Sequence, residues 1–399
     1  MEPTVLHIFS GDLWAGAEVM IHNLLAQLHL DNQVRLIALS MNEGVLTGKL
    51  RAVGVETHVI PEAQLSFPSI LLRAAWLLRS RRIDVIHSHR CKENLLGVFL
   101  AKRLGSPPVL STVHGLAESP SGFNMRSLAV AYLDRLVLRR FFSHVVGVSH
   151  DIARSLKETY GIDPKLLTVI HNGVPSSPAP PGGSNGRPAP RKPRVPHIGT
   201  VGRLVPVKDY PLFLATAAEI RRKLWPARFT IVGDGPLRDE LLRLSRELQL
   251  DDCVHFVRFQ QDLTAFYDTL DLYLSTSLHE GIPMSVLEAM ARGVPVVAPR
   301  VGGLPEILAS DHADNLIAGR DPTTWASRCL DLLTDDGLRS GASHTSQETV
   351  RTRFSIRRTA EEYVALYRSL NQPGLERSAR STPPPKGNQP ESSTTCLDH

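Results

Sequence analysis

The sequence has few cysteines and no arrangement of them that would cross-link a fold. Only four occur in 399 residues, and Cys91, Cys253, Cys329 and Cys396 lie far apart with no CxxC pair. This pattern favours neither a disulfide framework nor a zinc site, so a reducing compartment is expected. The 16 histidines show no HExxH or similar ligand spacing. We therefore predict no structural or catalytic metal.

Targeting and membrane-spanning signals are also lacking. The N-terminal segment MEPTVLHIFSGD has no basic region followed by a long apolar one, so no signal peptide is predicted. No run of about 18 uncharged apolar residues occurs, so no transmembrane helix is expected. A net charge of +5 permits an anionic partner but does not demand one. The 6% aromatic content and the lack of a recognised binding module argue against nucleic acid as a partner. We expect a cytoplasmic protein that could associate with the inner face of the plasma membrane.

Short apolar runs alternate with segments of helical spacing along most of the chain. Residues 5–9 are expected to form a buried strand, 18–29 a helix and 34–39 the next strand, and a similar alternation restarts at residue 197. This order is typical of parallel, doubly wound sheets. The sequence therefore predicts an α/β chain with two Rossmann-like domains facing across a cleft. The predicted boundaries are an N-terminal domain over 1–175, a Pro- and Gly-rich linker over 176–196, a C-terminal domain over 197–355, a helix over 356–370 that packs back toward the N-terminal domain, and a disordered tail over 371–399.

The most informative motif is a pair of glutamates eight residues apart, Glu280 and Glu288. They flank a Gly-Ile-Pro turn and a short helix that ends at Gly293. Both carboxylates could face one cleft, where they would accept hydrogen bonds from the vicinal hydroxyls of a sugar and a ribose. Glu288 has a structural alternative, because Ser285 and Glu288 match a capping box. Glu280 could instead be an exposed loop acid.

Two cations and a glycine turn follow the first strand of the second domain. Arg203 and Lys208 lie five residues apart beside Gly202 and could clamp a diphosphate. The alternative is a pair of solvated surface cations.

Gly16 opens the first helix of the chain, where backbone N–H groups could approach an anion. A simple strand-to-helix turn explains Gly16 equally well, and neither GxGxxG nor a P-loop is present.

Several histidines follow predicted strands. His114 would face the cleft near a bound sugar, although a hydrogen-bonded structural histidine is an equal alternative. His87 and His89 are expected to line the cleft, with no assigned role. Asn172 and Gly173 are interpreted as a turn through which the chain leaves the first domain.

Two predicted helices, over residues 70–82 and 125–142, combine arginines with many apolar residues. Such helices could rest on an anionic membrane surface. The preferred interpretation is an ordinary helix that packs on the core and carries charge on its outer face.

These motifs together resemble glycosyltransferase family 4, retaining enzymes of GT-B fold, over about residues 5 to 370. Several motifs in the right order are far more specific than any one of them. They are Ala-Gly-Ala-Glu at 15–18, Val-His-Gly at 113–115, Val-Ser-His at 148–150, His-Asn-Gly-Val at 171–174, Gly-Arg-x4-Lys at 202–208, Val-Gly-Asp-Gly-Pro at 232–236 and Glu-x7-Glu at 280–288.

The resemblance implies a retaining glycosyltransferase that moves a hexose-type sugar from a UDP- or GDP-sugar to a glycan or lipid-linked acceptor. Cell-surface polysaccharide or glycolipid synthesis would be its setting. The N-terminal domain would bind the acceptor and the C-terminal domain the nucleotide sugar, with no cofactor. Two alternatives remain open, a GT-B sugar-nucleotide 2-epimerase and a catalytically silent sugar-nucleotide-binding protein.

The resemblance also implies roles for individual residues. Glu288 would bind the ribose, Glu280 and residues 281–284 the sugar, and Arg203 with Lys208 the diphosphate. Gly16 would approach the phosphates, His114 would contact the sugar and assist the acceptor side, and Val257 with Arg258 would line the base pocket. The sequence departs from the family at Ala15 and Arg258, where glycine is usual. The predicted catalytic residues are thus His114, Arg203, Lys208 and Glu280, and the predicted donor-binding residues are Gly16, Gly202, Arg203, Lys208, Val257, Arg258, Glu280, Gly281, Ile282, Pro283, Met284 and Glu288.

Overall fold

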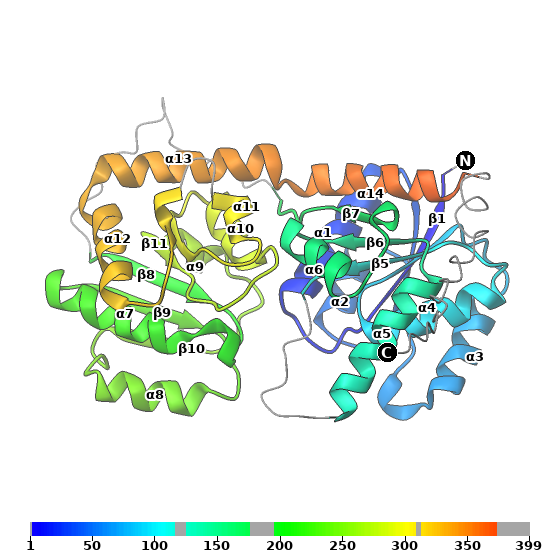
Figure 1. Cartoon of the computed structure of the whole chain (residues 1–399), viewed down its shortest axis with the longest axis horizontal. Helices are drawn as coiled ribbons and strands as arrows, with labels where there is room; N and C mark the ends of the chain where they lie inside the picture. The colour runs from blue at the N-terminus through cyan, green and yellow to red at the C-terminus, as the bar shows by residue number, and fades with distance from the viewer. Residues whose placement is uncertain (1, 116–124, 176–194, 309–312, 373–399) are drawn as a thin grey trace, which may run out of the picture.

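The computed structural model describes residues 2–115, 125–175, 195–308 and 313–372. The chain forms two lobes, each built on a parallel sheet with helices packed against it (Figure 1). This arrangement confirms the predicted α/β fold class with two doubly wound domains. Most of the expected linker and tail lies outside the described residues.

The first lobe holds a seven-stranded sheet of order β3-β2-β1-β4-β5-β6-β7. Its central strands are almost wholly buried, as expected for a parallel sheet covered on both faces. The strands are β1 (Thr4–Phe9), β2 (Arg35–Ser40), β3 (Thr57–Val59), β4 (Val85–Ser88), β5 (Val109–Val113), β6 (His144–Gly147) and β7 (Leu167–Val169), and the α-helices are α1 (Gly16–Asp31), α2 (Val45–Ala52), α3 (Phe67–Leu78), α4 (Cys91–Arg103), α5 (Met125–Phe141) and α6 (His150–Glu158).

The second lobe holds a six-stranded sheet of order β10-β9-β8-β11-β12-β13. Its strands are β8 (His197–Val201), β9 (Arg228–Val232), β10 (Val254–Val257), β11 (Leu272–Leu274), β12 (Val296–Pro299) and β13 (Leu316–Ile317). Its helices include α7 (Tyr210–Lys223), α8 (Arg238–Glu247), α9 (Thr264–Thr269), α10 (Met284–Ala291), α11 (Leu304–Leu308), α12 (Pro322–Thr334) and α13 (Asp336–Arg353).

The strand order of each sheet reverses direction at one point, between β1 and β4 in the first lobe and between β8 and β11 in the second. Open parallel sheets bind ligands beyond the carboxyl ends of their strands at such a switch point. The loops after these four strands are therefore the positions where a site is expected.

After α13 the chain returns to the first lobe and forms helix α14 (Ile356–Leu370) there (Figure 1). Figure 1 shows α13 running along the second lobe and α14 along the first. A bridge between Val174 and Ser355 joins the two crossing segments. Tyr363 and Tyr367 of α14 are fully buried in the first lobe. Within the described part of the chain, no helix has both the length and the apolar character needed to cross a bilayer.

Candidate active site

A large cavity of about 2200 Å³ lies between the lobes and is lined by both. Its walls include the loops after β1, β4 and β8 and the residues leading into α10. Ligand pockets commonly measure about 300–1,000 Å³. The cavity therefore has room for two substrates.

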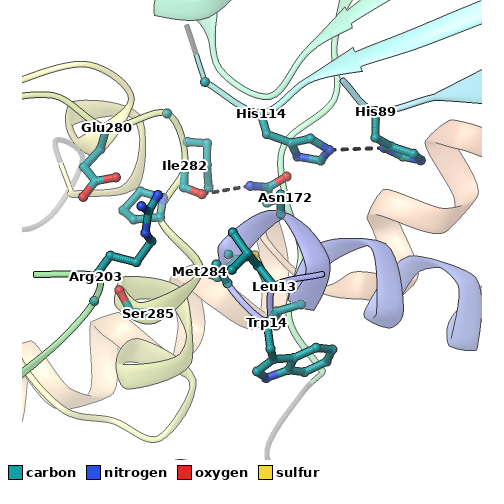
Figure 2. Close-up of a pocket in the computed structure, with 18 of the residues that line it drawn as sticks. Leu13, Trp14, His89, His114, Asn172, Arg203, Glu280, Ile282, Met284 and Ser285 are labelled. Carbon is teal, nitrogen blue, oxygen red and sulfur yellow. Dashed lines mark hydrogen bonds between the residues drawn. The ribbon is translucent and has the colours of Figure 1, made fainter. Parts of the chain in front are cut away.

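A partly buried ion pair joins two of the predicted catalytic residues at this cavity. Lys208 Nζ lies 2.5 Å from Glu280 Oε1, and Ser277 Oγ donates a hydrogen bond of 2.6 Å to the same carboxylate oxygen. Arg203 is exposed and lines the same cavity, and Figure 2 shows its side chain extending toward Glu280. The structure thus brings the cationic and the acidic motif together, so neither is an isolated surface feature.

Arg320 holds the Lys208 loop in place, and sequence reasoning missed it. Its guanidinium donates to the carboxylate of Asp209 and to the carbonyl oxygens of Thr276 and Ser277. Asp209 itself has a left-handed backbone with φ of 43°. Because Arg320 lies far along the chain, after β13, no local pattern indicates this contact.

Helix α10 begins at Met284 with Pro283 at its N-cap. The capping-box alternative for Glu288 is therefore wrong, since Ser285 lies inside the helix. The Glu288 carboxylate instead accepts a hydrogen bond of 2.9 Å from the Tyr267 hydroxyl and lines the cavity. Burial raises the pKa of Glu288 to about 7, against the opposing effects of Tyr267 and Arg292.

The loop before α10 passes close to the first lobe. A Cβ atom added to Gly281 would lie 2.8 Å from the carbonyl oxygen of His114, a distance that real Cβ atoms do not show. Gly302 has φ of 53°, and an added Cβ would lie 1.9 Å from the carbonyl oxygen of Glu280. Glycine at position 281 lets this loop pass close to the first lobe, and glycine at position 302 lets the chain after β12 pass close to Glu280.

The start of α1 lies close to the start of α10 at the cavity wall. Ala15 is the N-cap of α1 and has no side-chain oxygen, so the first amides of the helix and its positive dipole end remain available to an anion. Ala15 and Gly16 both line the cavity, and a Cβ added to Gly16 would lie 3.7 Å from the Met284 side chain. The Glu18 carboxylate accepts from the Ala15 amide and pairs with Arg90.

His114 follows β5 and lines the cavity. Its Nε2 lies 3.2 Å from Nδ1 of His89, whereas its buried Nδ1 has no partner among the described residues. Burial, assisted by the charge of Arg90, lowers the pKa of His114 to about 3. The imidazole is therefore neutral near pH 7.

His89 also lines the cavity, as expected. The expectation that His87 lines it is wrong, because the His87 ring is buried between Thr112 and Tyr367.

The structure places Val257 and Arg258 beside the cavity wall. Val257 ends β10, and Arg258 is exposed and pairs with Asp234 at 3.5 Å. Neither lines the cavity, whereas the five residues that follow, 259–263, all do. A role of Val257 and Arg258 in binding the base stays a prediction.

Asn172 makes a contact between the lobes that the turn interpretation did not include. Its side chain is buried, and its Nδ2 donates a hydrogen bond of 2.8 Å to the carbonyl oxygen of Ile282 (Figure 2). This contact anchors the loop before α10 to the segment that leaves the first lobe. The Oδ1 atom has no partner among the described residues.

Two groups in the described part of the chain have potential metal-ligand atoms within 4.8 Å of one another. In the first, the histidine nitrogens take part in hydrogen bonds. In the second, Glu306 accepts from backbone N–H groups and from His171. The absence of a catalytic metal stays a prediction. The groups are His7, His87 and His89, and His150, His171 and Glu306.

Known solved structures share this fold. The chain superimposes on HepE from Anabaena in complex with UDP-glucose with a TM-score of 0.75 and 21% identity, covering 92% of this chain and 99% of that one. A glycosyltransferase from Rickettsia africae gives a TM-score of 0.74 at 18% identity, covering 94% of this chain and all of that one.

Sequence relatives agree with this fold. The chain is 27% identical over 299 residues to UDP-Gal:alpha-D-GlcNAc-diphosphoundecaprenol alpha-1,3-galactosyltransferase of Escherichia coli, covering 73% of this chain and 76% of that protein. It is 28% identical over 385 residues to D-inositol 3-phosphate glycosyltransferase of Salinispora tropica, covering 88% and 77%. Residues 14–177 match the family model for glycosyltransferase family 4, and residues 195–335 match that for glycosyl transferases group 1. With both lobes accounted for, the chain belongs to the family 4, group 1 glycosyltransferases of GT-B fold.

Proposed function

We propose that the protein transfers a hexose from a UDP- or GDP-sugar, with retention of anomeric configuration, to a glycan or lipid-linked acceptor. Synthesis of a cell-surface polysaccharide or glycolipid would be its cellular role. The observation that carries the proposal is the Lys208–Glu280 pair at the cavity, with Arg203 beside it. The relative that acts on a diphosphoundecaprenol-linked sugar supports the acceptor class, and the UDP-glucose complex of HepE supports the donor class.

The donor is proposed to lie along the second lobe. Glu288 would accept from the ribose hydroxyls, and Glu280 with the loop at 281–284 would hold the sugar. The diphosphate would lie between the Arg203–Lys208 pair and the N-terminus of α1. In this position the negative charge of the diphosphate would be stabilised by both lobes, since a helix N-terminus and paired cations both favour an anion.

The chemistry follows from where charge develops. Cleavage of the bond between the anomeric carbon and the phosphate oxygen puts negative charge on the β-phosphate, which Arg203 and Lys208 would stabilise in place. Double displacement needs a carboxylate free to attack. The Glu280 carboxylate is held through Oε1 by both Lys208 and Ser277, and the Glu288 carboxylate is hydrogen-bonded to Tyr267. We therefore favour attack by the acceptor hydroxyl on the same face, with its proton passing to the leaving β-phosphate.

The acceptor is proposed to enter from the first lobe. The cavity wall there includes polar side chains of α4, β5 and α5, among them Asn94, Ser111 and Asp134. The outer face of the neighbouring helices is apolar and basic. Trp76 of α3 is 65% exposed and Tyr132 of α5 is 64% exposed. We infer that this face contacts an anionic membrane that supplies a lipid-linked acceptor.

The proposal is tested by incubating the protein with several UDP- and GDP-sugars and a membrane lipid extract. Transfer of the sugar into a lipid fraction, with the anomeric configuration kept, is the expected result. Release of a free epimerised sugar nucleotide without acceptor would favour the epimerase alternative. Binding of a nucleotide sugar without turnover would favour the silent one. Vesicles with and without anionic lipid, sedimented with the protein, test the membrane contact.

A further inference from the structure

A continuous run of hydrogen bonds leads from the cleft through the interior of the first lobe to α14. We call it the imidazole chain. Every member except His114 is buried. The members, in order from the cleft, are His114, His89, His7, Tyr367, His87, Thr112 and Tyr363, and the successive distances between their polar atoms are 3.2, 3.3, 3.3, 2.8, 2.8 and 2.8 Å.

The imidazoles of this chain are neutral, which fixes how they bond. Burial lowers the pKa of His7 to about 3 and lowers the pKa of His87 and of His89 well below the usual value. A neutral imidazole has one N–H donor and one acceptor nitrogen. His7, His87 and His89 each use both nitrogens in the chain. Each ring that accepts at one nitrogen must therefore donate at the other. The donor-to-acceptor direction of one hydrogen bond thus sets the direction of the next bond across each ring.

One direction satisfies every hydroxyl hydrogen in the chain. Tyr363 donates to Thr112, Thr112 donates to His87, and His87 donates to the oxygen of Tyr367. Tyr367 then donates to Nε2 of His7, and the bonds continue through His89 to Nε2 of His114. The only N–H left over is the one on Nδ1 of His114, at the cavity.

Every other direction leaves a buried hydrogen without an acceptor among the described residues. In the reverse direction, it is the hydroxyl hydrogen of Tyr363, whose oxygen bonds only to Thr112. If the direction changes within the chain, it is the hydroxyl hydrogen of Thr112 or Tyr367. An unpaired buried polar hydrogen costs free energy, so the first direction is favoured.

We infer that Tyr367 of α14 is a positioning residue that holds His114 in the tautomer with its hydrogen on Nδ1. The cavity then receives a fixed, neutral N–H donor. Its complement is Oδ1 of Asn172, a buried atom of the same cavity wall that also has no partner among the described residues. This oxygen is an acceptor, because Nδ2 of the same side chain donates to Ile282. A donor and an acceptor together suit a hydroxyl group. Resting on the proposed function, this inference assigns them to a hydroxyl of a bound sugar.

The test uses the full-length protein labelled with ¹⁵N at histidine, with His114→Gln to assign the His114 signals. The ring nitrogen shifts of the wild type are expected to report hydrogen on Nδ1 without any substrate. In Tyr367→Phe, Nε2 of His7 loses its partner in either direction, so a mixture of His114 tautomers is expected. Tyr363→Phe is the matched control, because Thr112 still has to donate to His87 and the direction is kept.

Activity provides a second readout. In Tyr367→Phe, kcat/KM is expected to fall about twofold to tenfold, because only a fraction of the protein would then hold His114 in the tautomer with its hydrogen on Nδ1. In the control Tyr363→Phe, kcat/KM should stay within about twofold of wild type. His114→Asn, whose amide can replace the Nδ1–H, should keep more activity than His114→Gln. Melting temperatures show whether each variant folds.

Three results would overturn the inference. One is hydrogen on Nε2 of His114 in the wild type, and another is a single unchanged tautomer in Tyr367→Phe. The third is stoichiometric metal bound through His7, His87 and His89 in the purified protein. Because the nitrogen shifts are measured without substrate, they stand even if no sugar transfer is found, which would sink only the proposed function.

Discussion

The Lys208 ammonium lies 2.5 Å from the Glu280 carboxylate, although one residue follows β8 and the other follows β11. Since Lys208 is proposed to stabilise charge on the leaving phosphate, Lys208→Ala should lower kcat by about 10²–10³-fold. Steady-state kinetics with the preferred nucleotide sugar measure the effect. Lys165→Ala, at an exposed lysine of the first lobe, is the matched control. Equal kcat in the two variants would remove Lys208 from the mechanism.

The same pair makes a prediction about additivity. Removing Lys208 leaves the Glu280 carboxylate, whose side chain is 13% exposed, without its cation. Residues that act as one unit show strongly non-additive effects. The double variant Lys208→Ala/Glu280→Ala should therefore lose much less than the product of the two single losses in kcat/KM. Full additivity would mean that the two side chains act independently.

The raised pKa of Glu288 predicts a pH-dependent affinity for the donor. A carboxyl with a pKa of about 7 is largely protonated at pH 6 and ionised at pH 8. The ionised form accepts more strongly from the ribose hydroxyls than the protonated acid does, so KM for the nucleotide sugar should fall as pH rises through 7. In Glu288→Gln this dependence should disappear, with a higher KM at pH 8. A KM in the wild type that does not change with pH would contradict the assignment.

Much of the fold could be predicted because its signals are local. The strand at residues 5–9 and the helix at 18–29 appear in the structure as β1 and α1 with boundaries shifted by one or two residues. Helix α13 was not predicted, since its sequence is polar and contains Gly337 and Gly341. Its helical form depends on packing against α10 and α12 rather than on propensity.

The site was predictable where motifs follow a strand and was missed where contacts are long-range. Arg203, Lys208 and Glu280 are found at one cavity because each follows the carboxyl end of a parallel strand. Arg320 and Tyr367 have no such local signal. Their partners lie at least 43 residues away in sequence, so only the folded chain shows what they contact.

Gly281 allows the two lobes to approach each other closely, and adding one methyl group at this position tests whether the close approach matters. Gly281→Ala would place Cβ 2.8 Å from the His114 carbonyl oxygen and force the loop or the lobes to shift. A displacement of about 1 Å near the reacting groups can cost 10²-fold, so kcat/KM should fall by about that factor. Gly48→Ala is the control, because an added Cβ on the exposed face of α2 meets no atom within 4 Å. Comparable kcat/KM in both variants would mean that the contact does not matter.

Glu306 ties the lobes together, and its removal should destabilise the protein. Its carboxylate accepts from the backbone N–H groups of His150 and Asp151, at the start of α6, and from His171. These contacts, opposed by burial, lower the pKa of Glu306, so the ionised form stabilises the fold above the ordinary carboxyl pKa and this contribution is lost as pH falls through the lowered value. Glu306→Gln should lower the free energy of unfolding by about 1–3 kcal/mol at pH 7, with a smaller difference in acid. Urea titrations at both pH values measure it, and Glu361→Gln, which breaks an exposed pair with Arg357, should change stability much less. A loss at pH 7 no greater than that of Glu361→Gln would show that the carboxylate contributes no more than a surface charge.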